Sequence, residues 1–167
     1  MQFSVGDKVV HPRYGPGAIT SIDRKDLMDG PKLYYVIQMA ASGLTVQIPV
    51  GKADEAGLRF AMARSRLPQV LLILQRTPHL LPKDYRERQA RIGDQLRTGR
   101  ASQLAMAVRD LTWHRKLAHL TKTDKDNLRQ GSDLLAAEMS MVSGDKVSDT
   151  SKLIAATMVA ALAGVAD

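Results

Sequence analysis

Residues 3–22 read FSVGDKVVHPRYGPGAITSI, and they set the pattern for the first third of the chain. Valine, isoleucine and threonine nearly alternate with other residues, as in half-buried β-strands. Gly6-Asp7 and Gly15-Pro16-Gly17 break that alternation with residues that supply a positive φ or the fixed φ of proline. Strands and turns of this kind continue to about residue 50. So few short antiparallel strands favour a small, strongly bent barrel of SH3 or Tudor type.

Beyond Gly51 the spacing of apolar residues changes from about two to about 3.6, so the remainder is predicted to be helical. We expect a short helix near residues 52–62 and a buried helix around Val70 and Leu74. A third helix should begin at residues 84–85, and three more should span about 100–119, 123–144 and 148–163. Asp84 and Thr123 are the expected N-caps, each with an acidic residue three positions later. The predicted class is α+β, with a Tudor-like β-barrel domain over residues 1–52 and an all-α domain over residues 53–167.

The composition excludes several classes of protein. The 167 residues include no cysteine, which removes disulfides, thiolate nucleophiles and cysteine-based zinc sites. The N-terminus has no signal-peptide pattern, and the most apolar run, residues 153–166, is shorter than the roughly 20 residues that span a bilayer. We therefore expect a cytoplasmic protein with no membrane partner.

Positive charge is concentrated in the middle of the chain. The formal net charge is +7, and residues 83–129 contain 12 Lys/Arg against 6 Asp/Glu, whereas residues 130–167 contain 2 against 5. A basic region of this kind is compatible with an ordinary solvated surface or with binding to nucleic acid, and charge alone does not separate the two.

The sequence contains no recognisable catalytic motif. GxSxG, HExxH and P-loop patterns are absent, and Gly15-Pro16-Gly17 is better explained as a turn between strands. His114 and His119 are five residues apart and lie on different faces of a helix, which argues against a shared metal ion, while Asp110 and His114 have the spacing of a surface pair. We expect no catalytic residue, no metal site and no cofactor. An enzyme with an unrecognised site remains the least favoured alternative.

The stretch PKDYRERQAR, residues 82–91, opens a helix with one aromatic residue in its first turn. Tyr85 shares a predicted stripe with Gln89, Ile92 and Leu96, and it could simply pack as a helix-end staple. The cations around it favour a second interpretation, in which they contact phosphates while the ring meets a base step. The candidate DNA-binding residues are Lys83, Tyr85, Arg86, Arg88 and Arg91. Trp113, near the end of the next helix, is expected to be partly buried.

Several stretches together resemble the CarD/CdnL family of bacterial transcription regulators. These are FSVGDKVVHPRYGPGAITSI, LTVQIPVGKADEAGLR, PKDYRERQAR and VRDL, which are spread over essentially the whole chain. The pattern VGDxVVxPxxG, from Val5 to Gly15, is shared with the polymerase-interacting domain of transcription-repair coupling factors. The helical region makes the resemblance specific to CarD-like proteins.

The resemblance implies a barrel that binds the β subunit of RNA polymerase and a helical domain that contacts promoter DNA at the upstream edge of the bubble. Tyr85 stands where the family places a wedging tryptophan, and the polymerase contacts match Lys25, Leu27 and Gln47. We therefore expect a monomeric, non-enzymatic regulator that stabilises the open complex. The alternative is a Tudor- or KOW-like module that binds RNA or the ribosome with the same basic helices.

Overall fold

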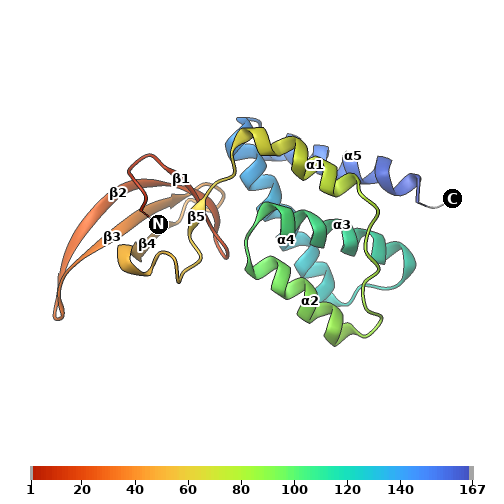
Figure 1. The fold of residues 1–167 in the computed structure, drawn as a ribbon, viewed down its shortest axis with the longest axis horizontal. Helices are drawn as coiled ribbons and strands as arrows, with labels where there is room; N and C mark the ends of the chain where they lie inside the picture. The colour runs from red at the N-terminus through yellow and green to blue at the C-terminus, as the bar shows by residue number, and fades with distance from the viewer. Residues whose placement is uncertain (1, 166–167) are drawn as a thin grey trace. The chain divides into compact units, whose positions relative to one another are not determined.

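The structure, a computed structural model, describes residues 2–165 and divides into two compact units between Ala61 and Met62. The first unit contains the strands and the second contains the long helices (Figure 1). The α+β class, with an antiparallel sheet first and helices after it, is confirmed.

The first unit is a five-stranded antiparallel sheet in the order β4-β3-β2-β1-β5. Its strands are β1 (Lys8–His11), β2 (Gly15–Leu27), β3 (Gly30–Met39), β4 (Thr45–Pro49) and β5 (Arg59–Phe60). A short 3-10 helix, Val50–Lys52, follows β4. Phe3, Ile19, Tyr35, Ile37 and Met39 are among the core residues of this unit.

The sheet bends where β2 changes register. A β-bulge lies between Ile19 and Ser21, and such an extra residue increases the local twist and curvature of a strand. Near this bend β2 also approaches β3 closely, because a Cβ added at Gly17 would lie 2.7 Å from the carbonyl oxygen of Gln38. The second glycine of Gly15-Pro16-Gly17 is therefore required by strand packing, and this segment begins β2 rather than forming the turn before it.

The hairpin of β2 and β3 extends beyond the core. Leu27 pairs with Gly30, so only Met28 and Asp29 form the turn, and Gly30 has φ +101°. All residues of β2 from Asp23 onward are exposed. The long curved hairpin in Figure 1 therefore presents the end of β2 to solvent.

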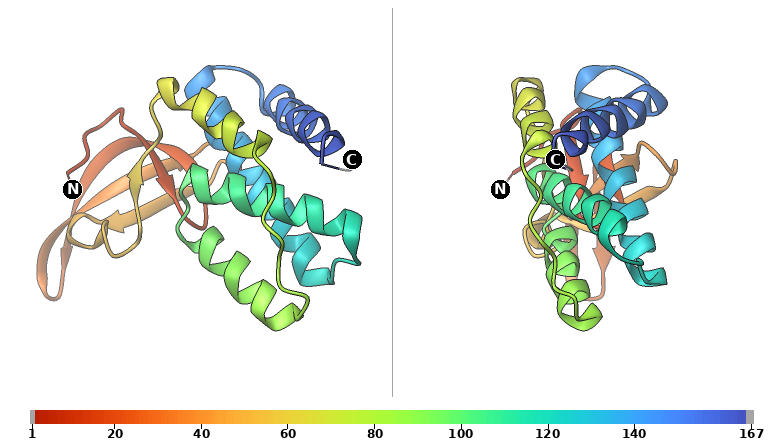
Figure 2. Two further views of the ribbon diagram at one scale, coloured as in Figure 1. Left: turned by 45° about the vertical axis from the view of Figure 1, so that its right-hand side comes forward. Right: turned by 90° about the vertical axis from the view of Figure 1, so that its right-hand side faces the viewer.

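The second unit is a five-helix bundle centred on α3. Its helices are α1 (Leu67–Gln75), α2 (Tyr85–Arg97), α3 (Ala101–Leu117), α4 (Lys122–Ser143) and α5 (Val147–Ala163), and a 3-10 turn, Arg64–Arg66, precedes α1. Helix α3 packs against α1, α2 and α4, and α5 packs against α1 and α4 (Figure 2). The core is aliphatic, with Leu104, Val108, Leu111 and Leu135 fully buried.

Two expectations about element boundaries are corrected. The predicted helix near residues 52–62 does not form, because residues 59–60 pair with β1 as β5, and Ala53 and Leu58 lie in the core of the sheet. By its internal contacts, the first compact unit extends to Ala61. The N-cap of α4 is Thr121, which forms a capping box with Asp124, and not Thr123.

Candidate nucleic-acid and protein interfaces

Helix α2 begins where the sequence predicts. Asp84 is its N-cap, and one carboxylate oxygen accepts hydrogen bonds from the backbone N–H groups of Arg86 and Glu87, at 2.9 and 3.0 Å. These bonds satisfy two of the donors that a helix start leaves without a partner. The cap therefore fixes Tyr85 as the first residue of the helix.

The Tyr85 ring is exposed and has a cation beside it. Its side chain is 47% exposed, and the guanidinium carbon of Arg86 lies 5.6 Å from the ring centroid. Arg86 also donates a hydrogen bond from Nε to the Tyr85 hydroxyl at 3.1 Å. A flat ring that would normally be buried thus faces solvent and remains available to a ligand.

Three of the four predicted cations are exposed in this segment, and Arg86 is the one that lies beside the ring. Lys83, Arg86 and Arg91 are exposed. Together with Tyr85 they form what we call the α2 basic surface. The exposed carboxylates of Asp84 and Glu87 lie in the same segment, so its five charged side chains have a net charge of +1. Binding of phosphates by so small an excess is expected to be weak and sensitive to salt.

Arg88, the fourth predicted cation, does not belong to the surface. Its side chain is 4% exposed, and its Nε and one terminal nitrogen donate to Asp124 Oδ2 at 3.1 and 2.7 Å. The other terminal nitrogen donates to the carbonyl oxygens of Pro82 and Lys83 at 3.0 and 3.1 Å. A buried, paired guanidinium cannot reach a phosphate, so the prediction that Arg88 contacts DNA is corrected.

Arg88 instead anchors the start of α2 to the start of α4. It replaces Tyr85 in the predicted stripe, because Arg88, Ile92 and Leu96 are the buried residues of the helix. A second bond, from Gln89 Nε2 to Thr121 Oγ1 at 3.0 Å, joins the same two helix ends. These contacts, which the sequence did not indicate, hold the segment from which Tyr85 projects.

The anchor changes the protonation of two buried groups. Burial alone would raise the pKa of Asp124, but hydrogen bonds from Arg88 and Thr121 and the charge of Arg88 outweigh it, so this pKa lies below its usual value. Burial lowers the pKa of His114, and the nearby positive charge of Arg88 lowers it further, with Asp124 opposing the shift. His114 is therefore neutral at neutral pH.

Both shifts predict that the helical unit loses stability in acid. As pH falls below about 6.5 the unfolded chain protonates His114 before the folded protein does, and below about 3.9 the same holds for Asp124. In each window the unfolded state binds more protons, so the free energy of unfolding decreases. Urea unfolding followed by the fluorescence of Trp113 should show both losses of stability. In the His114→Gln variant, the free energy of unfolding should depend less on pH between about 7.5 and 5.5. An unchanged slope between pH 7.5 and 5.5 in that variant would contradict the assignment.

The residues predicted to bind polymerase share one face of the sheet. Lys25 of β2 hydrogen-bonds Gln47 of β4, and its Nζ lies 5.1 Å from the ring centroid of Tyr34 on β3. Leu27, two residues along the strand, is exposed on the same side as Lys25. We call Lys25, Leu27, Tyr34 and Gln47 the hairpin face. Tyr34 was missed because its contact with Lys25 depends on strand register.

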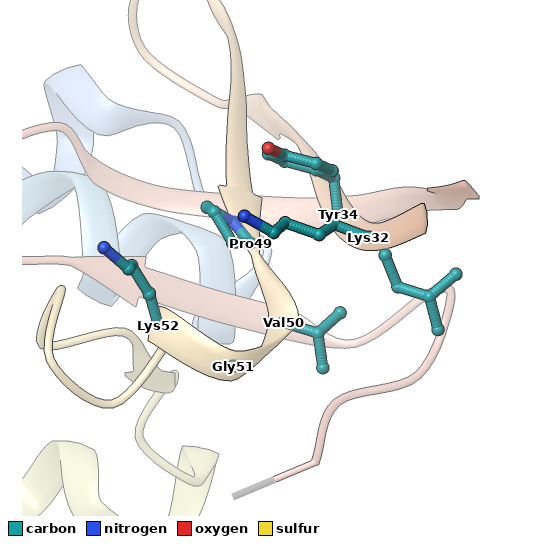
Figure 3. Close-up of a pocket in the computed structure, with 7 residues that line it drawn as sticks. Lys32, Tyr34, Pro49, Val50, Gly51 and Lys52 are labelled. Atoms are coloured by element: carbon teal, nitrogen blue, oxygen red, sulfur yellow. The ribbon is translucent and has the colours of Figure 1, made fainter. Parts of the chain in front are cut away.

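A pocket of about 620 Å³ lies beside the hairpin face. Tyr34 and Lys32 of β3 line it together with Pro49, Gly51 and Lys52, as Figure 3 shows. Tyr34 thus belongs to both the pocket and the hairpin face. The two lysines would favour a partner that presents carboxylates to this side of the sheet.

The remaining candidates have structural partners. Asp110 does not pair with His114, because it accepts from Arg109 Nε and from the backbone N–H of His79 at 2.8 and 2.9 Å. Trp113 is partly buried, as predicted, whereas His119 is exposed. Across residues 2–165 no three His, Asp or Glu side chains are grouped so that they could hold a metal ion. In the same range, no helix has the length and hydropathy to cross a membrane.

The comparison with known proteins decides the family. Residues 3–61 match the CarD-like/TRCF RID domain, and residues 69–155 match the CarD C-terminal domain. The chain belongs to the CarD-like family. The "Putative transcription factor YdeB" of Bacillus subtilis (strain 168) is 31% identical over 144 residues, which cover 85% of this chain and 93% of that protein.

A solved structure of a CarD domain is also similar to part of this chain. The 72-residue N-terminal domain of Myxococcus xanthus CarD, solved by NMR in solution, is 30% identical and covers 35% of this chain and 79% of its own, with a TM-score of 0.31. The two domain families and the Bacillus subtilis relative confirm, at the level of the family, the resemblance inferred from the sequence.

Proposed function

We propose that this CarD-like transcription regulator binds the β subunit of RNA polymerase with its hairpin face and stabilises the promoter open complex with its α2 basic surface. The observation that carries the proposal is Tyr85, an exposed ring with Arg86 beside it at a rigidly capped helix start. No bond is made or broken in the DNA. The protein acts by preferring one conformation of the promoter.

The α2 basic surface suits the junction between duplex and melted DNA. Lys83, Arg86 and Arg91 would contact phosphates, which position a protein without reading sequence. The Tyr85 ring would stack on the exposed base pair at the junction, a surface that closed duplex DNA does not offer. A protein that binds the open state better than the closed state shifts the equilibrium by that difference in affinity.

Tethering to polymerase compensates for weak DNA binding. The α2 basic surface has a net charge of +1, so the isolated protein should bind free DNA weakly and with little dependence on sequence. When the hairpin face holds the protein on polymerase, the DNA is present at an effective concentration of order millimolar. The contact with polymerase and the contact with DNA, each weak alone, together then hold the protein on the open complex.

Lys25 supports the assignment of the hairpin face. Gln47 and the Tyr34 ring hold its ammonium group at the surface, where it can meet a carboxylate of a partner. Leu27 adds an exposed apolar side chain two residues away. An exposed charge beside apolar area is a common composition for a transient protein interface.

A pull-down of RNA polymerase with the full chain tests whether the hairpin face binds polymerase. Lys25→Glu should weaken retention of polymerase by about tenfold, because it places a negative charge opposite an acidic partner surface. Arg24→Glu is the matched control, since it makes the same change of charge on the opposite face of the same strand. Equal losses in both variants would argue against the hairpin face.

Open-complex lifetime on one promoter tests the function as a whole. The unmodified protein should lengthen the lifetime, and Lys25→Glu should reduce that effect at limiting protein concentration. A lifetime that does not change when the protein is added would reject the proposal. Recovery of ribosomal proteins in place of the polymerase β subunit would favour the RNA- or ribosome-binding module instead.

A further inference from the structure

A pocket of about 410 Å³ lies beside the α2 basic surface and within the helical unit. Leu80 and Lys83, from the segment before α2, line it together with Leu117 and His119 from the end of α3 and the residues after it. Arg88 and His114 contribute buried polar groups to the lining. Lys83 is common to this pocket and the α2 basic surface.

Two exposed leucines give the pocket apolar walls. The exposed fractions are 73% for Leu80 and 56% for Leu117, although both residues line a concave site. Apolar side chains that stay in water at a pocket commonly mark a place where a ligand completes the burial. Branched apolar side chains of this kind can pack against the faces of a planar ring.

His114 supplies a polar group to the lining of the pocket. Its side chain is 7% exposed and lines the pocket, and within the described residues neither ring nitrogen makes a hydrogen bond. A neutral imidazole has one donor and one acceptor. Because its pKa is lowered by burial and by Arg88, His114 can offer both at neutral pH. Neither ring nitrogen is among the fully buried side-chain atoms that lack a partner, so a ligand could replace solvent at this edge of the ring.

The charge of the pocket selects an anion. Lys83 is the exposed cation of the lining, and no carboxylate is part of it. Arg88 adds little free charge because its guanidinium is already paired with Asp124. The volume lies at the lower end of the range of ligand sites, about 300–1,000 Å³, and so suits one small ligand and not a duplex segment.

We propose that this pocket receives one unpaired nucleotide of a DNA strand, with its base between Leu80 and Leu117 and its phosphate at Lys83. The base edge would exchange hydrogen bonds with His114, as enzymes that extrude a base read its edge with polar groups and hold its faces with apolar ones. The inference rests on the proposed function, because Lys83 connects the pocket to the surface that contacts DNA. It adds a second reason to prefer melted DNA, beyond stacking on Tyr85.

NMR titration of the full chain with three probes tests the inference. The probes are a blunt duplex, the same duplex with a single-stranded overhang, and thymidine monophosphate. The overhang should shift the signals of His114 and Leu117 as well as those of Arg86 and Arg91, whereas the blunt duplex should shift only the latter two. Affinity for the overhang should exceed that for the blunt duplex by about tenfold, the scale expected for one stacked base.

A variant with a matched control removes one wall of the pocket. Leu117→Ala should lower the preference for the overhang by about threefold and leave blunt-duplex binding unchanged, because it deletes apolar contact without changing charge. Leu72→Ala is the control, since Leu72 is 53% exposed on α1 and does not line this pocket. It should leave both affinities unchanged.

The outcomes separate this inference from the proposed function. Equal binding of blunt and overhang DNA, with no shift at His114, would overturn the pocket assignment and leave the α2 basic surface intact. Thymidine monophosphate binding as tightly as the overhang DNA would make this a site for free nucleotides and would also overturn the inference. Absence of shifts with either DNA, at low salt, would reject the DNA-binding function and the pocket together.

Discussion

Replacing Arg88 by methionine is expected to lower the free energy of unfolding of the helical unit by about 3–5 kcal/mol, the cost of removing one partner of a buried ion pair. Asp124 is fully buried, and Arg88 donates two hydrogen bonds to one of its oxygens. Without the guanidinium the carboxylate would keep its desolvation penalty and lose its compensation. The carbonyls of Pro82 and Lys83 would lose a donor as well.

Trp113 offers a direct measurement of this loss. It is the single tryptophan in the chain and lies in α3, so its fluorescence reports on the helical unit during urea unfolding. Arg97→Met is the matched control, because Arg97 is on the same helix and pairs with Asp94 at the surface. An exposed pair of this kind contributes about 1 kcal/mol or less.

A double variant separates loss of the pair from loss of packing. Arg88→Met combined with Asp124→Asn removes both charges while an amide oxygen can still accept from the backbone N–H of Thr121. The combined loss should be smaller than the sum of the two single losses, since neither charge is left without its partner. Strict additivity, or a loss for Arg88→Met no larger than for Arg97→Met, would contradict the role of this anchor.

Regular periodicity and capping were sufficient to predict most of the helical unit. The expected limits of α3 and α5 lie within a few residues of the observed ones, and Asp84 caps α2 as its spacing indicated. These signals are local, because a cap and an apolar stripe involve residues only three or four positions apart. The same reasoning placed Tyr85 at an exposed first turn.

Arg88 and residues 53–61 could not be placed in this way because their partners are distant in sequence. A lone arginine among Lys83, Arg86 and Arg91 has the pattern of a solvated cation, and its partner Asp124 is 36 residues away. Strand β5 has only two residues and depends on pairing with β1, about 50 positions earlier. The contact of Lys25 with Tyr34 likewise requires the register of β2 and β3.

Replacing Tyr85 by alanine is expected to shorten the open-complex lifetime by about tenfold relative to the unmodified protein, because one stacked ring contributes about 1–3 kcal/mol. Polymerase binding should not change, since the hairpin face lies in the other unit. Stability should change little as well, because the ring is 47% exposed and lies outside the buried stripe of α2.

Tyr14→Ala is the matched control for this substitution. Tyr14 is also an exposed tyrosine with an arginine beside its ring, since the guanidinium carbon of Arg13 lies 5.5 Å from the ring centroid. It is in the first unit and outside the hairpin face. Loss of lifetime in both variants would indicate a general effect of removing a surface tyrosine, and would remove the reason for assigning Tyr85 to DNA.

Tyr85→Trp distinguishes stacking from hydrogen bonding at the same position. Tryptophan has more stacking area but lacks the hydroxyl that accepts the bond from Arg86 Nε. If the ring stacks on the base pair at the junction, the lifetime should increase severalfold above that of the unmodified protein. If Tyr85 serves mainly to orient Arg86 toward a phosphate, the lifetime should fall toward that of Tyr85→Ala, and its dependence on salt should weaken.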